Sequence, residues 1–156
     1  MLSTGDKLPN FKLQNQNGTF VESNSLAGSW SVIYFYPKDN TPGCTQESCE
    51  FRDNLSALAA NNVKVFGVSK DSVASHKKFA EKFDLNFDIL SDSDGALCEA
   101  FGVWVEKNMY GKKSYGIQRA TFIINPSGNV AHAWPKVSVN GHVMAVKEKL
   151  LELLNQ

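Results

Sequence analysis

An uninterrupted apolar run, Val32-Ile33-Tyr34-Phe35-Tyr36, is the strongest indication of how this chain folds. A strand with water on one side alternates apolar and polar residues, because successive side chains point to opposite faces. This run does not alternate, so it predicts a strand at residues 31–36 that is covered on both faces of its sheet. Helices on both sides of a partly parallel sheet provide such cover.

The segments around this strand alternate between strand and helix patterns. Strands at 11–13 and 19–21 flank Asn15-Gln16-Asn17-Gly18, in which Asn-Gly is a strong hairpin signal. The following elements are expected to be a helix from Thr41 to Asn61-Asn62, a strand at 63–68, a helix from about Val73, a strand at 87–90 and a short helix at 95–101. Residues 106–116 are polar and predict a loop or a loose hairpin. Strands at 120–124 and 130–134 then form a hairpin, and the last helix begins near Gly141.

This order predicts an α/β protein with a central mixed β-sheet, flanking helices and an N-terminal β-hairpin. No repeat, low-complexity tract or linker interrupts the chain, so we expect a single domain over residues 1–156.

The composition excludes several classes of function. Sixteen basic and sixteen acidic residues cancel, which leaves no net charge to attract nucleic acid or an anionic membrane. No apolar run approaches the ~20 residues of a membrane span, and the first residues lack the pattern of an export signal. We therefore expect a cytoplasmic protein that binds neither nucleic acid nor membranes.

Cys44 carries the clearest chemical signal. It follows the central strand in Thr41-Pro42-Gly43-Cys44, and if Thr41 caps the next helix, Cys44 lies in the first turn. The free N–H groups and the positive end of the helix dipole favour the thiolate, the reactive form of cysteine. We expect a reactive thiolate that accepts hydrogen bonds from the Thr41 hydroxyl or backbone; a buried structural thiol is the alternative.

Cys49 lies five residues further along the same predicted helix. The Cα atoms of such a pair are roughly 8–9 Å apart in a regular helix, whereas a disulfide spans at most ~7 Å. A bond between Cys44 and Cys49 therefore requires the first turns of the helix to unwind. The alternative for Cys49 is a thiol packed on the inner face of the helix. Three cysteines are too few for a disulfide scaffold, and this spacing is not a C-x-x-C pair.

A metal site is not indicated. The chain lacks C-x-x-C and H-x-x-x-H spacings, so His76, His132 and His142 are expected to be structural, and no metal or cofactor is expected. None of the histidines has the local motif of a papain-type Cys–His pair.

Arg119 is the best candidate for the cation that a thiolate needs when it attacks a peroxide. If the strand at 120–124 runs antiparallel to the central strand, its start lies beside the end of that strand, close to Cys44. A surface arginine is the alternative. Glu47, one turn after Cys44, is expected to be a solvated helix residue whose charge would oppose a thiolate.

The sequence Phe35-Tyr36-Pro37-Lys38-Asp39-Asn40-Thr41-Pro42-Gly43-Cys44-Thr45, with Glu47 and Cys49, resembles the bacterioferritin-comigratory-protein or peroxiredoxin Q subfamily. Within it, Pro37-x-x-x-Thr41-x-x-Cys44 is similar to the active-site signature of peroxiredoxins. Further similar stretches are Gly102-Val103-Trp104, Glu106-Lys107, Met109-Tyr110-Gly111-Lys112-Lys113, Gly116-Ile117-x-Arg119-x-Thr121-Phe122, Trp134-x-Lys136-Val137 and Gly141-His142.

The resemblance implies a thioredoxin-like fold and a thiol peroxidase that reduces hydrogen peroxide and organic hydroperoxides to water and alcohols. It implies that Cys44 is the peroxidatic cysteine, which becomes a sulfenic acid. Cys49 would be the resolving cysteine, which closes an intramolecular disulfide that thioredoxin or a similar dithiol then reduces. Pro37 would shield the sulfur from bulk water, while Thr41 and Arg119 would hold the thiolate and the peroxide. We expect a monomer without a cofactor.

Two positions differ from the pattern of the family. Ser48 stands where alanine is expected, and Cys98 matches a position that is cysteine in only some members. We expect Cys98 to be a buried thiol.

Two other functions stay open. One is a general thiol–disulfide oxidoreductase, disfavoured because C-x-x-C and a proline immediately before the 120–124 strand are both absent. The other is a peroxide sensor or chaperone-like module whose unwound helix exposes apolar surface.

Overall fold

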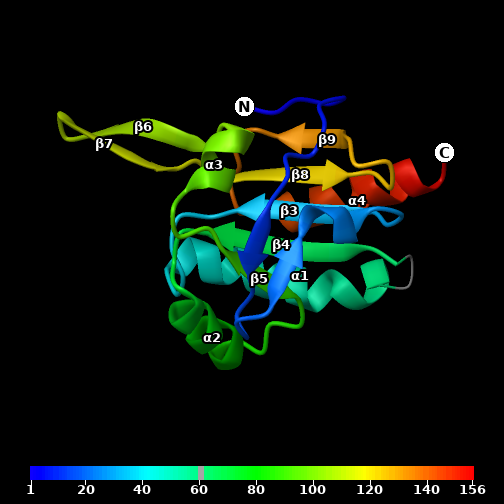
Figure 1. The fold of residues 1–156 in the computed structure, drawn as a ribbon, viewed down its shortest axis with the longest axis horizontal. Helices are drawn as coiled ribbons and strands as arrows, with labels where there is room; N and C mark the ends of the chain where they lie inside the picture. Colours follow the sequence, from blue (N-terminus) through cyan, green and yellow to red (C-terminus); the bar gives the residue numbers. More distant parts are fainter. Residues whose placement is uncertain (60–61) are drawn as a thin grey trace.

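The centre of the protein is a mixed sheet of seven strands in the order β2-β1-β5-β4-β3-β8-β9 (Figure 1). The structure is a computed structural model that describes residues 1–59 and 62–156. The strands are β1 (Lys12–Gln14), β2 (Phe20–Glu22), β3 (Ser31–Phe35), β4 (Lys64–Ser69), β5 (Asp88–Ser91), β8 (Ala120–Ile124) and β9 (Val130–Trp134). β3, β4 and β5 are parallel, whereas β1, β8 and β9 each pair antiparallel with their neighbours.

Helices cover both faces of this sheet, as the apolar run predicted. Residues of α1 (Pro42–Ala59), α2 (Val73–Lys82) and α4 (His142–Leu154) pack on one face. The short helix α3 (Ala96–Phe101) and the 3-10 helix η1 (Ser23–Leu26), which was not predicted, pack on the other. Every residue of β3 is buried, and its side chains alternate between the two cores. No helix in these described ranges is long and apolar enough to cross a membrane.

The predicted elements are confirmed with small shifts of their ends. The N-terminal hairpin turns at Asn15-Gln16-Asn17-Gly18, where the Asn15 carboxamide oxygen accepts from the backbone N–H groups of Asn17 and Thr19. α4 buries Val143, Val146 and Leu150. The predicted helix end at Asn61-Asn62 lies partly outside the described residues, because α1 is described to Ala59.

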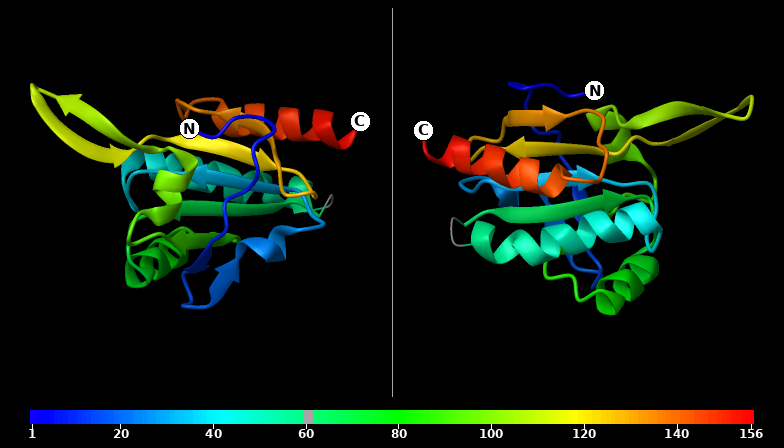
Figure 2. Two further views of the ribbon diagram at one scale, coloured as in Figure 1. Left: turned by 45° about the horizontal axis from the view of Figure 1, so that its top comes forward. Right: turned by 180° about the vertical axis from the view of Figure 1, so that it is seen from behind.

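Residues 106–116 are more regular than expected. β6 (Trp104–Met109) and β7 (Lys112–Ile117) form a two-stranded antiparallel sheet that projects from the body of the protein (Figures 1 and 2). Tyr110 and Gly111 make its turn, both with positive φ, as a two-residue hairpin turn that matches strand twist requires. The prediction of a loop was wrong and the prediction of a hairpin is confirmed. The two strands pair regularly from Trp104–Ile117 to Met109–Lys112, so the hairpin is not loose.

The sheet register brings distant parts of the chain to one place. β8 runs antiparallel to β3, and Phe35 at the end of β3 pairs with Ala120 at the start of β8. The residues that follow β3 therefore lie beside the residue that precedes β8. This is the antiparallel arrangement expected for Arg119 and Cys44.

Candidate active site

Cys44 lies in the first turn of α1, immediately beyond the carboxyl end of β3. The helix begins at Pro42, and the Thr45 N–H donates to the Thr41 carbonyl at 2.8 Å, which closes the first helical turn. The predicted start of the helix is thus confirmed. The cysteine is 1% exposed and belongs to the core between the sheet and α1. Its thiol therefore combines a helix start with a site from which bulk water is largely excluded.

The Arg119 guanidinium contacts two groups of α1 at once. Its Nη2 donates to Cys44 Sγ at 3.2 Å, and its Nη1 donates to Glu47 Oε1 at 2.7 Å. A Cβ at Gly43 would lie 3.3 Å from Nη2, so the glycine leaves room for the guanidinium. A fixed cation at this distance stabilises a negative charge on the sulfur. The surface alternative for Arg119 is excluded.

Glu47 is not solvated, so that expectation was wrong. Its side chain is fully buried and paired with Arg119, and its Oε2 has no hydrogen-bond partner among the described residues. Residues 44 and 47 share one face of the helix, and here that face packs toward Arg119. Burial raises the pKa of Glu47 from its usual 4.5 to about 7, although the neighbouring Arg119 acts to lower it.

This raised pKa predicts a pH dependence of stability. The unfolded chain releases the Glu47 proton near its usual pKa, whereas the folded protein keeps it up to about pH 7. Between the usual pKa of 4.5 and the folded pKa of about 7, the folded protein binds a proton that the unfolded chain has released. The free energy of unfolding should therefore fall by about 3 kcal/mol as the pH rises through this range. Glu47→Gln cannot ionise and should lack this decrease.

Urea unfolding at about pH 5 and about pH 8 measures the effect in both proteins. Glu50→Gln, on the same helix, is the matched control and should retain the decrease. Parallel pH profiles for the natural protein and Glu47→Gln would show that Glu47 ionises normally in the folded state.

Thr41 makes a different hydrogen bond from the one expected. Its hydroxyl donates to the Lys38 carbonyl at 2.8 Å, so its single proton is not directed to Cys44 Sγ. The bond instead closes the turn that leads into α1. Pro37 is exposed at the end of β3, and its shielding of the sulfur stays a prediction.

A buried polar network holds the loop before Cys44, and sequence analysis missed its central residue, Asp39. The Asp39 carboxylate accepts from the Tyr36 hydroxyl at 2.5 Å and the Ser75 hydroxyl at 2.8 Å, and it lies 2.7 Å from His76 Nδ1. His76 Nε2 in turn lies 3.0 Å from the Leu90 carbonyl. The His76 imidazole is therefore buried and held on both ring nitrogens within the fold. The network ties the loop after β3 to α2.

His142 is also buried and hydrogen-bonded within the fold. Its Nε2 lies 2.8 Å from the Thr121 hydroxyl. Burial, and secondarily the Arg119 charge, lowers its pKa to about 4. The imidazole is therefore neutral at neutral pH and adds no charge beside Arg119.

The other two cysteines differ in their surroundings. Cys49 is half-buried on α1, while Cys98 is fully buried in the core on the opposite face of the sheet. Burial, together with the Asp92 carboxylate, raises the pKa of the Cys98 thiol well above its usual value. Cys98 is thus a protonated core thiol, which agrees with the structural role expected for it.

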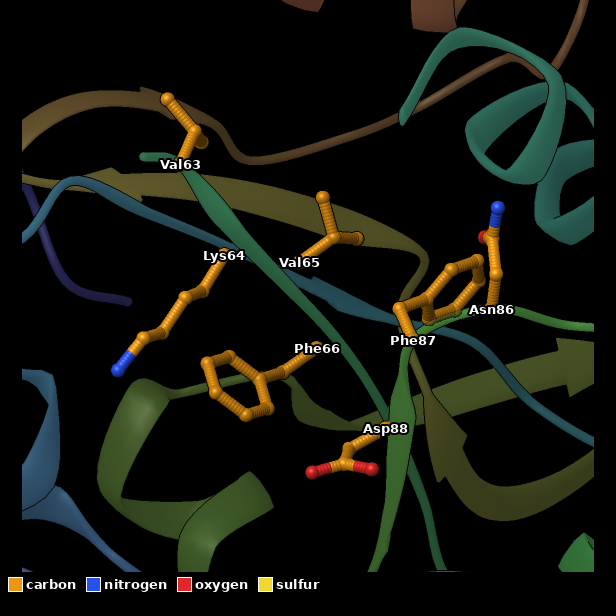
Figure 3. Close-up of a pocket in the computed structure, with 7 residues that line it drawn as sticks. All are labelled: Val63, Lys64, Val65, Phe66, Asn86, Phe87 and Asp88. Carbon is orange, nitrogen blue, oxygen red and sulfur yellow. The ribbon is translucent and has the colours of Figure 1, made fainter. Parts of the chain in front are cut away.

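The protein has a pocket of about 310 Å³, whose lining residues are drawn in Figure 3. It is lined at the amino ends of β4 and β5, including Lys64 and Asp88. Lys64 pairs with Ser31 at the start of β3, whereas Cys44 follows the end of that strand. The pocket and the cysteine therefore lie at opposite ends of the parallel strands, and the pocket does not contribute to the site.

Comparison with known proteins identifies related chains over most of the length. Residues 4–133 match the AhpC/TSA family. Peroxiredoxin Bcp of Bacillus subtilis is 41% identical over 152 residues, with 97% of each chain covered. A cysteine-to-serine mutant of Xanthomonas campestris peroxiredoxin Q superimposes with a TM-score of 0.92 at 44% identity, covering 98% of this chain and 99% of the other.

A second Xanthomonas campestris structure concerns the alkyl peroxide reduction activity of its bacterioferritin comigratory protein, seen in trapped intermediate/ligand complexes. It superimposes with a TM-score of 0.89 at 46% identity, with 92% of each chain covered.

Proposed function

This chain belongs to the AhpC/TSA family of peroxiredoxins, which are thiol-dependent peroxidases, and we propose that Cys44 is the thiolate with which it attacks a peroxide. The observation that carries this assignment is the hydrogen bond from Arg119 Nη2 to the buried Cys44 sulfur in the first turn of a helix. Burial and the Asp92 carboxylate instead keep the Cys98 thiol protonated and unreactive.

In the first step the Cys44 thiolate attacks the terminal oxygen of the peroxide. The S–O bond forms while the O–O bond breaks, so the sulfur is oxidised to a sulfenic acid and the peroxide is reduced. The departing alkoxide, or hydroxide for hydrogen peroxide, takes a proton and leaves as alcohol or water. Arg119 stabilises the charge as it moves from sulfur to the departing oxygen.

In the second step the Cys49 thiol attacks the Cys44 sulfur. The S–S bond forms, the S–O bond breaks and water leaves. Both cysteines lie within α1, where a pair at this spacing is about 8–9 Å apart at Cα, so the start of the helix must unwind first. A dithiol protein such as thioredoxin then supplies two electrons and restores both thiols.

The proposed substrates are hydrogen peroxide and organic hydroperoxides. The alkyl peroxide reduction activity of the related Xanthomonas campestris protein supports the organic class. The Arg119 guanidinium beside the buried Cys44 sulfur can stabilise the charge on the departing oxygen of either class. We propose that the protein acts as a monomer, since both redox cysteines belong to one helix.

Cys49→Ser should separate the two steps. One equivalent of hydrogen peroxide should still convert Cys44 to a sulfenic acid, but no intramolecular disulfide can close. Turnover with a thioredoxin system should therefore fall by at least about tenfold. Mass spectrometry after the single equivalent, with a sulfenic acid trap, measures both species.

Disulfide mapping of the natural protein is the matched experiment. A Cys44–Cys49 bond within one chain is expected. A bond that includes Cys98, or unchanged recycling in Cys49→Ser, would transfer the resolving role to another residue. A stable oxidised protein that thioredoxin does not reduce would instead favour a peroxide sensor.

A further inference from the structure

The segment between Cys44 and Cys49 has an anchor that the proposed chemistry does not use. We propose that the buried hydrogen bond between Tyr34 and Ser48 sets the rate at which α1 unwinds, and hence the rate at which the Cys44–Cys49 disulfide closes. This inference rests on the proposed function, because it concerns the second step of that reaction.

The bond lies in a fully enclosed place. Tyr34 Oη and Ser48 Oγ are 2.7 Å apart, and both residues are 0% exposed. A Cβ at Gly67 would lie 2.8 Å from Tyr34 Oη, which shows how closely the neighbouring strand packs on this hydroxyl. Burial raises the pKa of Tyr34 well above its usual value, so the hydroxyl stays protonated and able to donate. Neither hydroxyl reaches water while α1 is folded.

The position of Ser48 links this bond to the resolving step. Ser48 lies between the two cysteines, so unwinding that brings Cys49 to Cys44 moves it away from Tyr34. Beyond Cys49 the helix has other anchors: Phe51 stacks on Tyr34 with ring centroids 4.6 Å apart, and Arg52 donates to the Phe83 carbonyl. The Tyr34–Ser48 bond thus belongs to the part of α1 that must open.

The two hydroxyls bond to each other and to none of the groups that react with peroxide, although Tyr34 packs in the same core as Cys44. Other side-chain hydrogen bonds of the opening segment join Cys44 and Glu47 to Arg119, and Gln46 to Asn140 and Glu50. Changing Cys44 or Glu47 disturbs the guanidinium, whereas Ser48 contacts neither Arg119 nor the Cys44 sulfur through its hydroxyl. A change at Ser48 should therefore alter the second step more than the first.

The direction of the effect follows from which hydroxyl is left without a partner. In Ser48→Ala the Tyr34 hydroxyl stays buried and unpaired while α1 is folded, but it reaches water once the helix opens. The folded state is therefore destabilised relative to the open one. In Tyr34→Phe the Ser48 hydroxyl can bond the carbonyl one turn earlier in its own helix, so the effect is smaller. When both residues are made apolar, no hydroxyl is left buried without a partner, and the stability of the folded helix changes little.

The test is a single-turnover measurement on the full chain. Reduced protein is mixed with one equivalent of hydrogen peroxide, quenched at intervals with a sulfenic acid trap, and analysed by mass spectrometry. Ser48→Ala should close the Cys44–Cys49 disulfide about three- to tenfold faster than the natural protein. Sulfenic acid formation should change by less than about twofold. Tyr34→Phe with Ser48→Ala should return toward the natural rate.

Ser31→Ala is the matched control, since Ser31 is also fully buried but lies at the far end of β3. It should leave disulfide closure unchanged. Equal closure rates in Ser48→Ala and the natural protein would overturn the inference, and so would a double variant as fast as Ser48→Ala. Absence of any sulfenic acid at Cys44 in the natural protein would instead overturn the proposed function, so the two failures are distinct.

Discussion

Peroxide consumption should be lost completely when Cys44 is replaced by serine. A serine hydroxyl keeps its proton at neutral pH and cannot act as the thiolate nucleophile, even with Arg119 3.2 Å from the position of the sulfur. The rate should fall to that of the reductant and peroxide alone. The measurement follows hydrogen peroxide in the presence of a thioredoxin system.

Cys98→Ala is the natural comparison for this variant, because Cys98 is buried in the other core. It should keep turnover within about twofold. Turnover that survives in Cys44→Ser and disappears in Cys98→Ala would show that the nucleophile is the wrong cysteine.

Arg119→Met should lower the second-order rate constant of Cys44 oxidation by about 10²–10³-fold. That range is typical when one charge-stabilising donor is removed from an active site. The rate constant of Arg119→Lys should fall between those of Arg119→Met and the natural protein. An ammonium group is a single point charge and cannot contact Glu47 and Cys44 at the same time as the guanidinium does. Competition kinetics against a peroxidase of known rate measure the constant.

Lys12→Met, which removes an exposed cation from the N-terminal hairpin, controls for the change in net charge. Thermal unfolding of Arg119→Met identifies any loss of structure from leaving Glu47 without its partner. An oxidation rate for Arg119→Met within about threefold of the natural value would exclude Arg119 from the chemistry.

The sequence predicted those parts of the site that depend on local pattern or on strand direction. The run Thr41-Pro42-Gly43-Cys44 gives the start of α1 because proline at the first helical position and a capping residue before it are local features. Arg119 was found from one topological assumption, that β8 runs antiparallel to β3, which the register confirms.

The errors concern partners that only the folded chain supplies. A carboxylate on a helix is usually solvated, and nothing near Glu47 in the sequence indicates that Arg119, from another strand, would share its burial. The single proton of Thr41 had two acceptors available, and only the turn geometry selects the Lys38 carbonyl. Asp39 acquires its role from His76, on the next helix.

The β6–β7 hairpin was uncertain for a different reason. Its strands project from the body, so they lack the apolar alternation of a half-buried strand. The available signal was Tyr110-Gly111 at the turn, but tyrosine is an unusual residue at positive φ.

The separation of the two cores also governs which cysteines can pair. Three thiols permit three different intramolecular bonds, and oxidised proteins with several thiols are prone to scrambling. Cys44 and Cys98 lie on opposite sides of a seven-stranded sheet. A bond between them would have to breach the sheet, whereas Cys44 and Cys49 need only the start of one helix to unwind. We therefore expect Cys98 to stay a free thiol when Cys44 and Cys49 form the proposed disulfide.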